Sequence, residues 1–177
     1  CTKRPFFRSD IYFTYFTSWK DVRVVSDTLV QSIPNDALGF MPFGPLYDPQ
    51  YGALVKVVAD PKVYLLLGDT RYWITSEQVF EDLRYSWSWV EDVDERLLAK
   101  YKEGSVITDT TVHPNYTLIK YAGDAKVYRL EPHPVDLSKT VKRHVADEAT
   151  FRSLKYRFDR IVTIPSSERY DDGEPIK

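Results

Sequence analysis

Hydrophobic and polar positions change their period twice within one stretch in the middle of the chain. Apolar and β-branched residues fill Lys62–Leu67 and Thr70–Ile74, and the Gly68-Asp69 pair between them predicts a tight β-hairpin turn. From Ser76 onward the apolar positions recur at helical spacing, and Ser76 is expected to cap the N-terminus of a short helix. A tryptophan-rich return then leads into a brief predicted strand at Val90–Val93. The predicted order is therefore hairpin, helix and strand.

The same pattern returns nearer the C-terminus. Two blocks of the chain match two later blocks, the first at a spacing of 64 residues and the second at 71. The difference, 71 − 64, predicts a seven-residue insertion in the later hairpin, around Glu131–Pro134. Long matched blocks separated by one insertion indicate an internal repeat. The matched segments are Leu54–Lys56 with Leu118–Lys120, Lys62–Tyr64 with Lys126–Tyr128, Arg71–Ile74 with Lys142–Val145, and Leu83–Tyr85 with Leu154–Tyr156.

The N-terminal region matches only the second half of this unit, at a spacing of 68 residues. Ser9 is expected to cap its helix, Val22–Val25 to form its strand, and Ser26–Ile33 to form a second helix that corresponds to Asp94–Lys102. The sequence of this region lacks the hairpin that its helix would cover. We expect the following linker or a neighbouring chain to fill that place. The matched residues are Tyr12 with Phe80, Trp19 with Trp87, Val22 with Val90, Val25 with Val93, and Leu29 with Leu97.

These matches predict an α+β fold of tandem small repeats, each a short antiparallel β-meander with one or two short helices. A single unit with so little apolar surface would be marginal alone, whereas stacked units share burial. The predicted divisions are a partial repeat at 1–39, a Pro- and Gly-rich linker at 40–51, a full repeat at 52–107, a linker at 108–115, and a full repeat with the hairpin insertion at 116–177.

Composition narrows the class of protein. The chain has 177 residues, of which 43% are hydrophobic and 15% aromatic, so it has ample material for a packed core. Its formal net charge of −2 lacks the basic footprint of a nucleic-acid-binding protein, and we expect no nucleic-acid partner. No apolar run approaches the ~20 residues that a transmembrane helix needs. We therefore expect no transmembrane segment.

Cys1 is the only cysteine, so it cannot form an internal disulfide. Three interpretations stay open. Cys1 stands at the start of a fragment or processed chain, or it is the lipid-bearing first residue of a mature bacterial lipoprotein, or it forms an intermolecular disulfide. The second would tether the chain to a membrane without a spanning helix.

Candidate catalytic and metal-binding patterns are sparse. The three histidines, His113, His133 and His144, lack the spacing of metal ligands, and we expect no metal, cofactor or catalytic residue. The acidic run from Glu91 to Glu95 lacks the glycine of a calcium loop, so we interpret it as a solvated strand-to-helix junction.

Aromatic residues are the best candidates for contacts with a partner or a glycan. Tyr85, Trp87 and Trp89 alternate and would share one face of an extended segment, and Tyr12 and Tyr15 belong to a second aromatic cluster. Trp87 has an aromatic counterpart in each copy, which favours a core position. Trp89 is matched by polar residues, so it is the strongest candidate for an exposed contact, alongside Tyr85, Tyr12 and Tyr15.

The run LVK…DPKVYLL…RYWITSEQVF…WSWVEDV resembles a repeat of roughly 60 to 70 residues in bacterial surface and S-layer-like proteins. The resembling positions are Leu54–Lys56, Lys62–Tyr64, Arg71–Ile74, Ser76–Phe80 and Val90–Val93. This resemblance implies an exported protein, extracellular or at the cell surface, and it supplies no catalytic residues.

Two functional hypotheses follow. The favoured one is a non-enzymatic structural module of an extracellular surface protein, a homo-oligomer or polymer that self-associates into a filament or array. The alternative is a cell-wall carbohydrate-binding module that holds glycans with Trp89 and nearby tyrosines. An enzyme is disfavoured, because no set of catalytic residues can be recognised.

Overall fold

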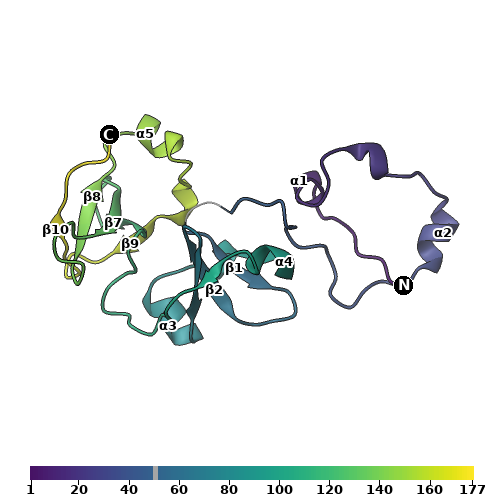
Figure 1. Ribbon diagram of the computed structural model, residues 1–177, viewed down its shortest axis with the longest axis horizontal. Coiled ribbons are helices and arrows are strands. Elements are labelled where there is room, and N and C mark those ends of the chain that lie inside the picture. Colours follow the sequence, from purple (N-terminus) through teal and green to yellow (C-terminus); the bar gives the residue numbers. More distant parts are fainter. Residues whose placement is uncertain (50–51) are drawn as a thin grey trace.

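Two β-sheets dominate the computed structural model, which describes residues 1–49 and 52–177 (Figure 1). Within these residues the first sheet has the strand order β4-β1-β2-β3-β5 and the second the order β10-β8-β7-β6-β9. The strands of the first sheet are β1 (Leu54–Val57), β2 (Val63–Leu67), β3 (Thr70–Ile74), β4 (Val90–Val93) and β5 (Lys102–Glu103). Those of the second are β6 (Leu118–Tyr121), β7 (Tyr128–Pro132), β8 (Thr140–His144), β9 (Val162–Ile164) and β10 (Asp171–Asp172).

Short helices connect and cover these strands, so the predicted mixture of helix and strand is confirmed. The N-terminal segment, which we define as residues 1–39, contains helices but no strand. The last two residues of the predicted 40–51 linker lie outside the described residues. The helices are α1 (Ser9–Tyr12), α2 (Asp27–Ser32), α3 (Glu77–Asp82), α4 (Glu95–Leu98) and α5 (Glu148–Ser153), and the 3₁₀ turns are η1 (Trp19–Asp21), η2 (Trp87–Trp89) and η3 (Phe158–Arg160).

Each sheet is mixed, with an antiparallel centre and parallel edges. In the first sheet β1, β2 and β3 form the predicted antiparallel meander, and β4 and β5 add to it in parallel. In the second sheet β6, β7 and β8 form the meander, and β9 and β10 are the parallel edges. The parallel edges were not predicted. The edges β4 and β9 are parallel because a helical crossover, α3 or α5, carries the chain back to the far side of the meander, and the chain then returns to the near side to add β5 or β10.

Local capping explains where the helices begin and end. The Ser76 and Asp147 side chains accept hydrogen bonds from the third residue of α3 and α5, as predicted. The prediction for Ser9 was wrong, because Ser9 is the first residue of α1 and Arg8 precedes the helix without a side-chain cap. Helices α3 and α5 are each followed by a residue with positive φ, Arg84 or Lys155, and by a backbone hydrogen bond back to the helix.

The two sheets share one hydrophobic core. Apolar side chains from one face of the first sheet and from α3 pack against the facing side of the second sheet. The opposite face of the first sheet is covered by α4 together with Phe43 and Tyr47 of the linker, and the opposite face of the second sheet by α5. The shared core comprises Leu54, Val63, Leu65, Leu67, Ile74, Phe80, Leu83, Tyr85, Ile107, Ile119, Tyr128, Leu130, Val162, Ile164 and Tyr170.

Charged residues mark the face of the second sheet that turns away from the shared core. Glu131 binds the guanidinium groups of Arg129 and Arg143, and Arg129 also donates to the Tyr156 hydroxyl. At the matched positions the first sheet has Leu65, Leu67 and Tyr72, which face the second sheet. The same sheet face is therefore apolar where another sheet covers it and ionic where none does.

His113 connects the part of the chain that forms the first sheet to the part that forms the second. Its ring is buried, with Nε2 2.9 Å from the Leu83 carbonyl oxygen beyond α3 and Nδ1 2.7 Å from the Glu168 carboxylate near β10. Burial acts to raise the pKa of Glu168, but hydrogen bonds from His113 and Tyr170 hold that pKa below its ordinary value. His113 lies in the connection between β5 and β6, and its role between the sheets was not predicted.

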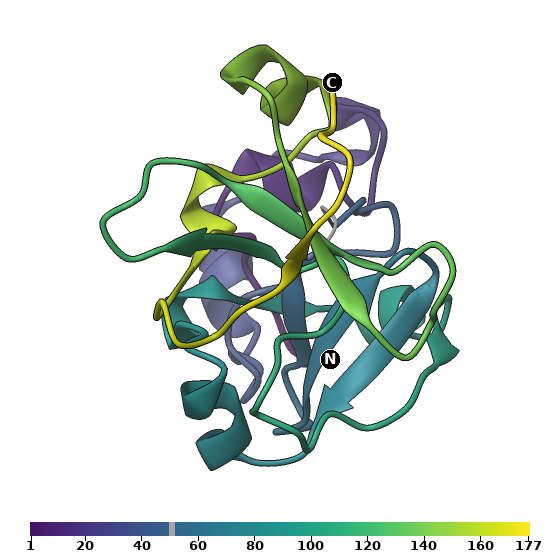
Figure 2. The same cartoon turned by 90° about the vertical axis from the view of Figure 1, so that its left-hand side faces the viewer.

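The parts of the chain follow one another along the long axis of the molecule. Figure 1 shows the second sheet, the first sheet and the N-terminal segment in that order, and Figure 2 views the molecule from the second-sheet end. The N-terminal segment is an open ring, with the N-terminus on it and the C-terminus at the other end of the molecule.

We expect Leu130→Ala to destabilise both sheets together by about 2–5 kcal/mol, because Leu130 is fully buried between them. All four tryptophans precede residue 108, and in a background of Trp19→Phe and Trp89→Phe the fluorescence of Trp73 and Trp87 reports unfolding of the first sheet alone. That transition should move to lower denaturant although the substitution lies in the second sheet. Leu137→Ala is the matched control, because Leu137 is exposed. An unmoved tryptophan transition would contradict the shared core.

Candidate interaction surface

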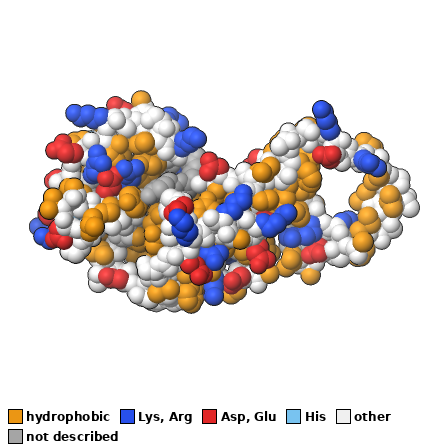
Figure 3. All heavy atoms as spheres, viewed as in Figure 1, with side chains coloured by type: hydrophobic (Ala, Val, Ile, Leu, Met, Phe, Trp, Pro, Cys, Tyr) orange, Lys and Arg blue, Asp and Glu red, His pale blue; other side chains and the backbone are white. Residues whose placement is uncertain are grey.

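The N-terminal segment leaves exposed the residues that its counterpart in the first sheet buries. Val25 is 48% exposed whereas the matched Val93 is 1% exposed, and Leu29 is 50% exposed whereas Leu97 is 2%. Every residue from 19 to 32 is exposed. Apolar side chains gather on this ring in the space-filling view (Figure 3). So large an apolar surface on so small a segment is typical of an interaction site.

The strand predicted at Val22–Val25 does not form. Its counterpart β4 is a strand because β1 lies beside it and pairs with it from Leu54 to Val57. The N-terminal segment offers no such neighbour within residues 1–49, so the backbone of Val22–Val25 has no ladder to join. The prediction was wrong because a suitable pattern of side chains does not form a strand unless a neighbouring strand is present to pair with it.

Aromatic stacking joins the first helix and the 3₁₀ turn of the N-terminal segment in the same way as in the predicted full repeats, 52–107 and 116–177. The ring of Tyr12 in α1 stacks on Trp19 in η1 with centroids 4.4 Å apart. Phe80 stacks on Trp87 at 4.1 Å in the first unit, and Phe151 on Phe158 at 4.2 Å in the second. The helix and the 3₁₀ turn are therefore joined by the same aromatic contact three times along the chain.

The linker does not fill the place of the absent hairpin. Phe43 instead pairs in parallel with β4, donating its N–H to the Asp92 carbonyl at 2.9 Å and accepting from the Asp94 N–H at 2.7 Å. Gly44 and Leu46 donate their backbone N–H groups to Thr14, at 2.5 and 2.8 Å. Through residue 49, the linker thus fastens the N-terminal segment to the outer edge of the first sheet.

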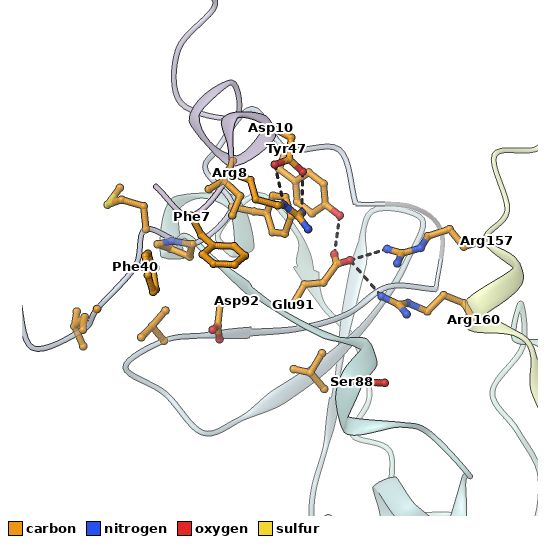
Figure 4. A pocket seen from close by; sticks show the side chains of 18 residues that line it. Phe7, Arg8, Asp10, Phe40, Tyr47, Ser88, Glu91, Asp92, Arg157 and Arg160 are labelled. Carbon is orange, nitrogen blue, oxygen red and sulfur yellow. Dashed lines mark hydrogen bonds and ion pairs between the residues drawn. The ribbon is translucent and has the colours of Figure 1, made fainter. Parts of the chain in front are cut away.

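Glu91 is the centre of the junction between the parts (Figure 4). Its side chain, 14% exposed, accepts from Arg157 at 2.6 Å, from Arg160 at 3.3 Å and from the Tyr47 hydroxyl at 2.6 Å. Burial, together with the hydrogen bond to Glu91, raises the pKa of Tyr47, so this hydroxyl keeps the proton that it donates. The expectation of a solvated acidic run was wrong for Glu91, since this carboxylate connects β4, the linker and η3.

A cavity of about 910 Å³ opens beside this junction. Its walls come from the N-terminal segment, the linker, β4 and η3. The charges around it are paired within the chain, Arg8 with Asp10 at 2.8 Å and Asp92 with Lys56 at 2.6 Å. The cavity is therefore interpreted as the gap between packed parts rather than as a built polar site.

The sequence-predicted contact residues lie mostly inside the molecule. Tyr85 and Tyr12 are buried, and Trp89 is half-buried with the Arg160 guanidinium 5.7 Å from its ring centroid. Tyr15 is half-buried and donates to Asp94 at 3.1 Å, and burial raises its pKa to about 12. Cys1 is exposed and free, so both a lipid tether and an intermolecular disulfide stay predictions.

Sequence reasoning missed the exposed aromatic residues. Trp87 was assigned to the core, yet it is about half exposed, as are the matched Trp19 and Phe158. Each ring stacks on an aromatic side chain of its helix and keeps about half of its surface exposed, and the Arg152 guanidinium lies 5.2 Å from the Phe158 ring centroid. Beside Trp87 and Phe158 lie two grooves of about 240 and 300 Å³ at corresponding places. Recurrence of an aromatic residue indicates a recurring contact, and here that contact is a stacked pair at the surface.

Metal and membrane sites find little support in the described residues. Residues 1–49 and 52–177 contain no group of three or more His, Cys, Asp or Glu side chains that could hold a metal ion. Among the same residues, no helix is both long enough and apolar enough to cross a bilayer.

Comparisons with known proteins identify no relative. No family model, curated protein or solved structure matches the chain. The resemblance to bacterial surface repeats therefore stays a prediction.

We expect Glu91→Gln to lower the free energy of unfolding by about 1–3 kcal/mol, because a neutral amide cannot balance the two guanidinium groups that face it. Glu95→Gln is the control, since Glu95 is an exposed neighbour in the same acidic run. Chemical denaturation measures the stability, and hydrogen exchange at the Tyr47 amide measures release of the linker. Equal stability and equal exchange in both variants would contradict a junction centred on Glu91.

Proposed function

We propose that this chain is a non-enzymatic structural module that associates with other polypeptides through its N-terminal segment. The observation that carries the proposal is the contrast between Val25 and Leu29, half exposed, and Val93 and Leu97, which are buried at the matched positions. Residues that form a core in one part of the chain form a surface in another. Covering such a surface with a second chain is favourable, by roughly 25 cal/mol per Å² of apolar area removed from water.

The proposed architecture is a row of stacked repeats. Support comes from the equal order and sense of strands in both sheets, and from the three stacked aromatic pairs that follow the sequence spacings. In such a row the ionic cluster of Arg129, Glu131 and Arg143 acts as a polar end cap. Association is therefore expected at the opposite end, through the N-terminal segment, and growth into a filament or array would start there.

The proposed location is the cell surface or the extracellular space. It rests on the resemblance of the LVK…KVY…RYWI run to bacterial surface repeats. An exposed Cys1 suits a covalent link between chains, and a homo-oligomer or polymer is the expected assembly.

Self-association should depend on the exposed apolar residues. We expect the Cys1→Ser chain to assemble as its concentration rises, and the added pair Val25→Asp and Leu29→Asp to abolish assembly without loss of stability, because both residues are already exposed. Sedimentation velocity over a concentration series measures assembly. Val135→Asp with Leu137→Asp is the matched control, since these residues are exposed in the hairpin insertion. A chain that stays monomeric, or a Val25/Leu29 variant that assembles like the control, would refute the proposal.

A carbohydrate-binding module is the second candidate, and the two matching grooves favour it. Each groove has a lysine and an acidic helix cap region beside a half-exposed aromatic ring, and a sugar could stack on such a ring while its hydroxyls bond to the polar groups. The corresponding lining residues are Lys62, Trp73, Ser76, Glu77 and Trp87 in one groove and Lys126, His144, Asp147, Glu148 and Phe158 in the other.

If glycans bind in these grooves, Trp87→Ala with Phe158→Ala should reduce retention on insoluble cell-wall glycan about 25-fold, since the two stacked rings contribute about 1 kcal/mol each. Trp89→Ala should change retention less, because Trp89 is half-buried under Arg160. Retention of the parent chain is measured in the same experiment. No retention of the parent, or equal retention of all three proteins, would exclude this candidate.

A further inference from the structure

The backbone of the N-terminal segment reproduces the outer edge of a complete sheet. Lys3 pairs in parallel with Asn35, and the Lys3 carbonyl accepts from the Asp36 N–H at 3.0 Å. The same two features join β3 to β5 and β8 to β10, at positions that follow the sequence spacings. The matching hydrogen bonds are Gly104 N–H to Arg71 carbonyl at 2.9 Å and Gly173 N–H to Lys142 carbonyl at 2.9 Å.

These correspondences assign each part of the ring to a strand of the sheet. Lys3 corresponds in position to β3, Asn35 to β5 and Val22–Val25 to β4. In the order β4-β1-β2-β3-β5 the two strands without a counterpart, β1 and β2, are adjacent. The ring therefore has a slot two strands wide. Strands lie about 4.8 Å apart, so a slot between β4 and β3 spans three spacings, about 14 Å.

The figures agree with a slot of this kind. Figure 1 shows the N-terminal segment as an open ring, and the space-filling view in Figure 3 shows an opening through it. Val25 and Leu29 are exposed, as expected for residues that would pack on the absent pair of strands. In the first unit, Val93 and Leu97 pack against Val55, Tyr64 and Leu66 of β1 and β2.

We propose that the slot takes a two-stranded β-hairpin that is apolar on both faces and leads directly into Thr2 through a tight turn. Its first strand would run parallel to Val22–Val25 and its second antiparallel to Lys3–Phe6. The first unit shows the chemistry required, because β1 and β2 bury side chains on both faces, Leu54 and Leu65 on one and Val55 and Leu66 on the other. The inference rests on the repeat architecture of the proposed function.

The source of the hairpin follows from the construction of the two complete sheets. In the first, β2 ends at Leu67 and β3 begins at Thr70, so a two-residue turn with positive φ at Gly68 joins hairpin and strand covalently. A hairpin extracted from a second copy is disfavoured, because Leu54 and Leu65 are buried in the core there and would have to leave it. The occupant is therefore a hairpin on the polypeptide that enters at Thr2.

A fusion tests the slot directly. Residues 52–68 are joined ahead of Cys1, so that Gly68 of the added hairpin precedes Cys1 as it precedes Asp69 in the first unit. The matched control carries Leu54→Asp and Leu65→Asp in the added hairpin only. Hydrogen exchange is read at the amides of residues 22–29, and exchange in the first sheet serves as the internal check that the protein is folded.

We expect amide exchange at residues 22–29 to slow at least tenfold in the fusion and to match the parent chain in the control. Exchange as fast in the fusion as in the parent, with the first sheet intact, would overturn the slot. If the free peptide 52–68 slowed exchange at residues 22–29 and the fusion did not, the inference that the hairpin is joined covalently ahead of Thr2 would be wrong.

The fusion also separates this inference from the proposed function. A filled slot should remove the exposed apolar surface, so a protected fusion that no longer self-associates supports both. If exchange slows in the fusion but the parent chain is monomeric, the slot is supported and self-association is refuted. An unprotected fusion whose parent still assembles through Val25 and Leu29 refutes the slot alone.

Discussion

A β-strand exists only beside a partner, and this constraint explains both the ordered and the open parts of the molecule. Val22–Val25 and Val90–Val93 have similar patterns, but β1 pairs with the second alone. Pairing satisfies the backbone N–H and C=O groups, and it brings the apolar faces of neighbouring strands together over the helices. Without β1 and β2 the N-terminal segment keeps its helical turns, its aromatic stack and its edge bridge, but it gains no core.

The second constraint is that a sheet has two faces, and each must be covered or made polar. The first sheet is covered on both faces, by the second sheet and by α4 with the linker. The second sheet packs on the first sheet with one face, and its other face packs against α5 and also carries the Arg129–Glu131–Arg143 cluster. The second sheet has Arg129 and Glu131 where the first sheet has Leu65 and Leu67 at matched positions, so this face is ionic in the second sheet and apolar in the first.

The sequence predicted the features that depend on neighbours along the chain. The meander strands, the caps at Ser76 and Asp147, and α4 could be read from periodicity and turn residues, because local backbone chemistry determines them. The parallel edges, the burial of His113 and the ion pairs of Glu91 depend on residues more than 25 positions away. Periodicity contains no information about such partners. For the same reason Trp87 and Trp89 were assigned in reverse, since a recurring aromatic residue indicates a recurring contact but not its depth.

Completion of the N-terminal sheet and association through it draw on the same surface. A hairpin in the slot would cover Val25 and Leu29 from within the polypeptide, and a second chain would cover them from outside. A covalently joined hairpin loses little translational freedom when it binds, whereas a second chain loses about 4–15 kcal/mol on association. A covalently joined hairpin would therefore bind this surface in preference to a second chain. The exposed surface of the N-terminal segment is then best understood as an unfinished core, and any assembly through it as a substitute for the missing pair of strands.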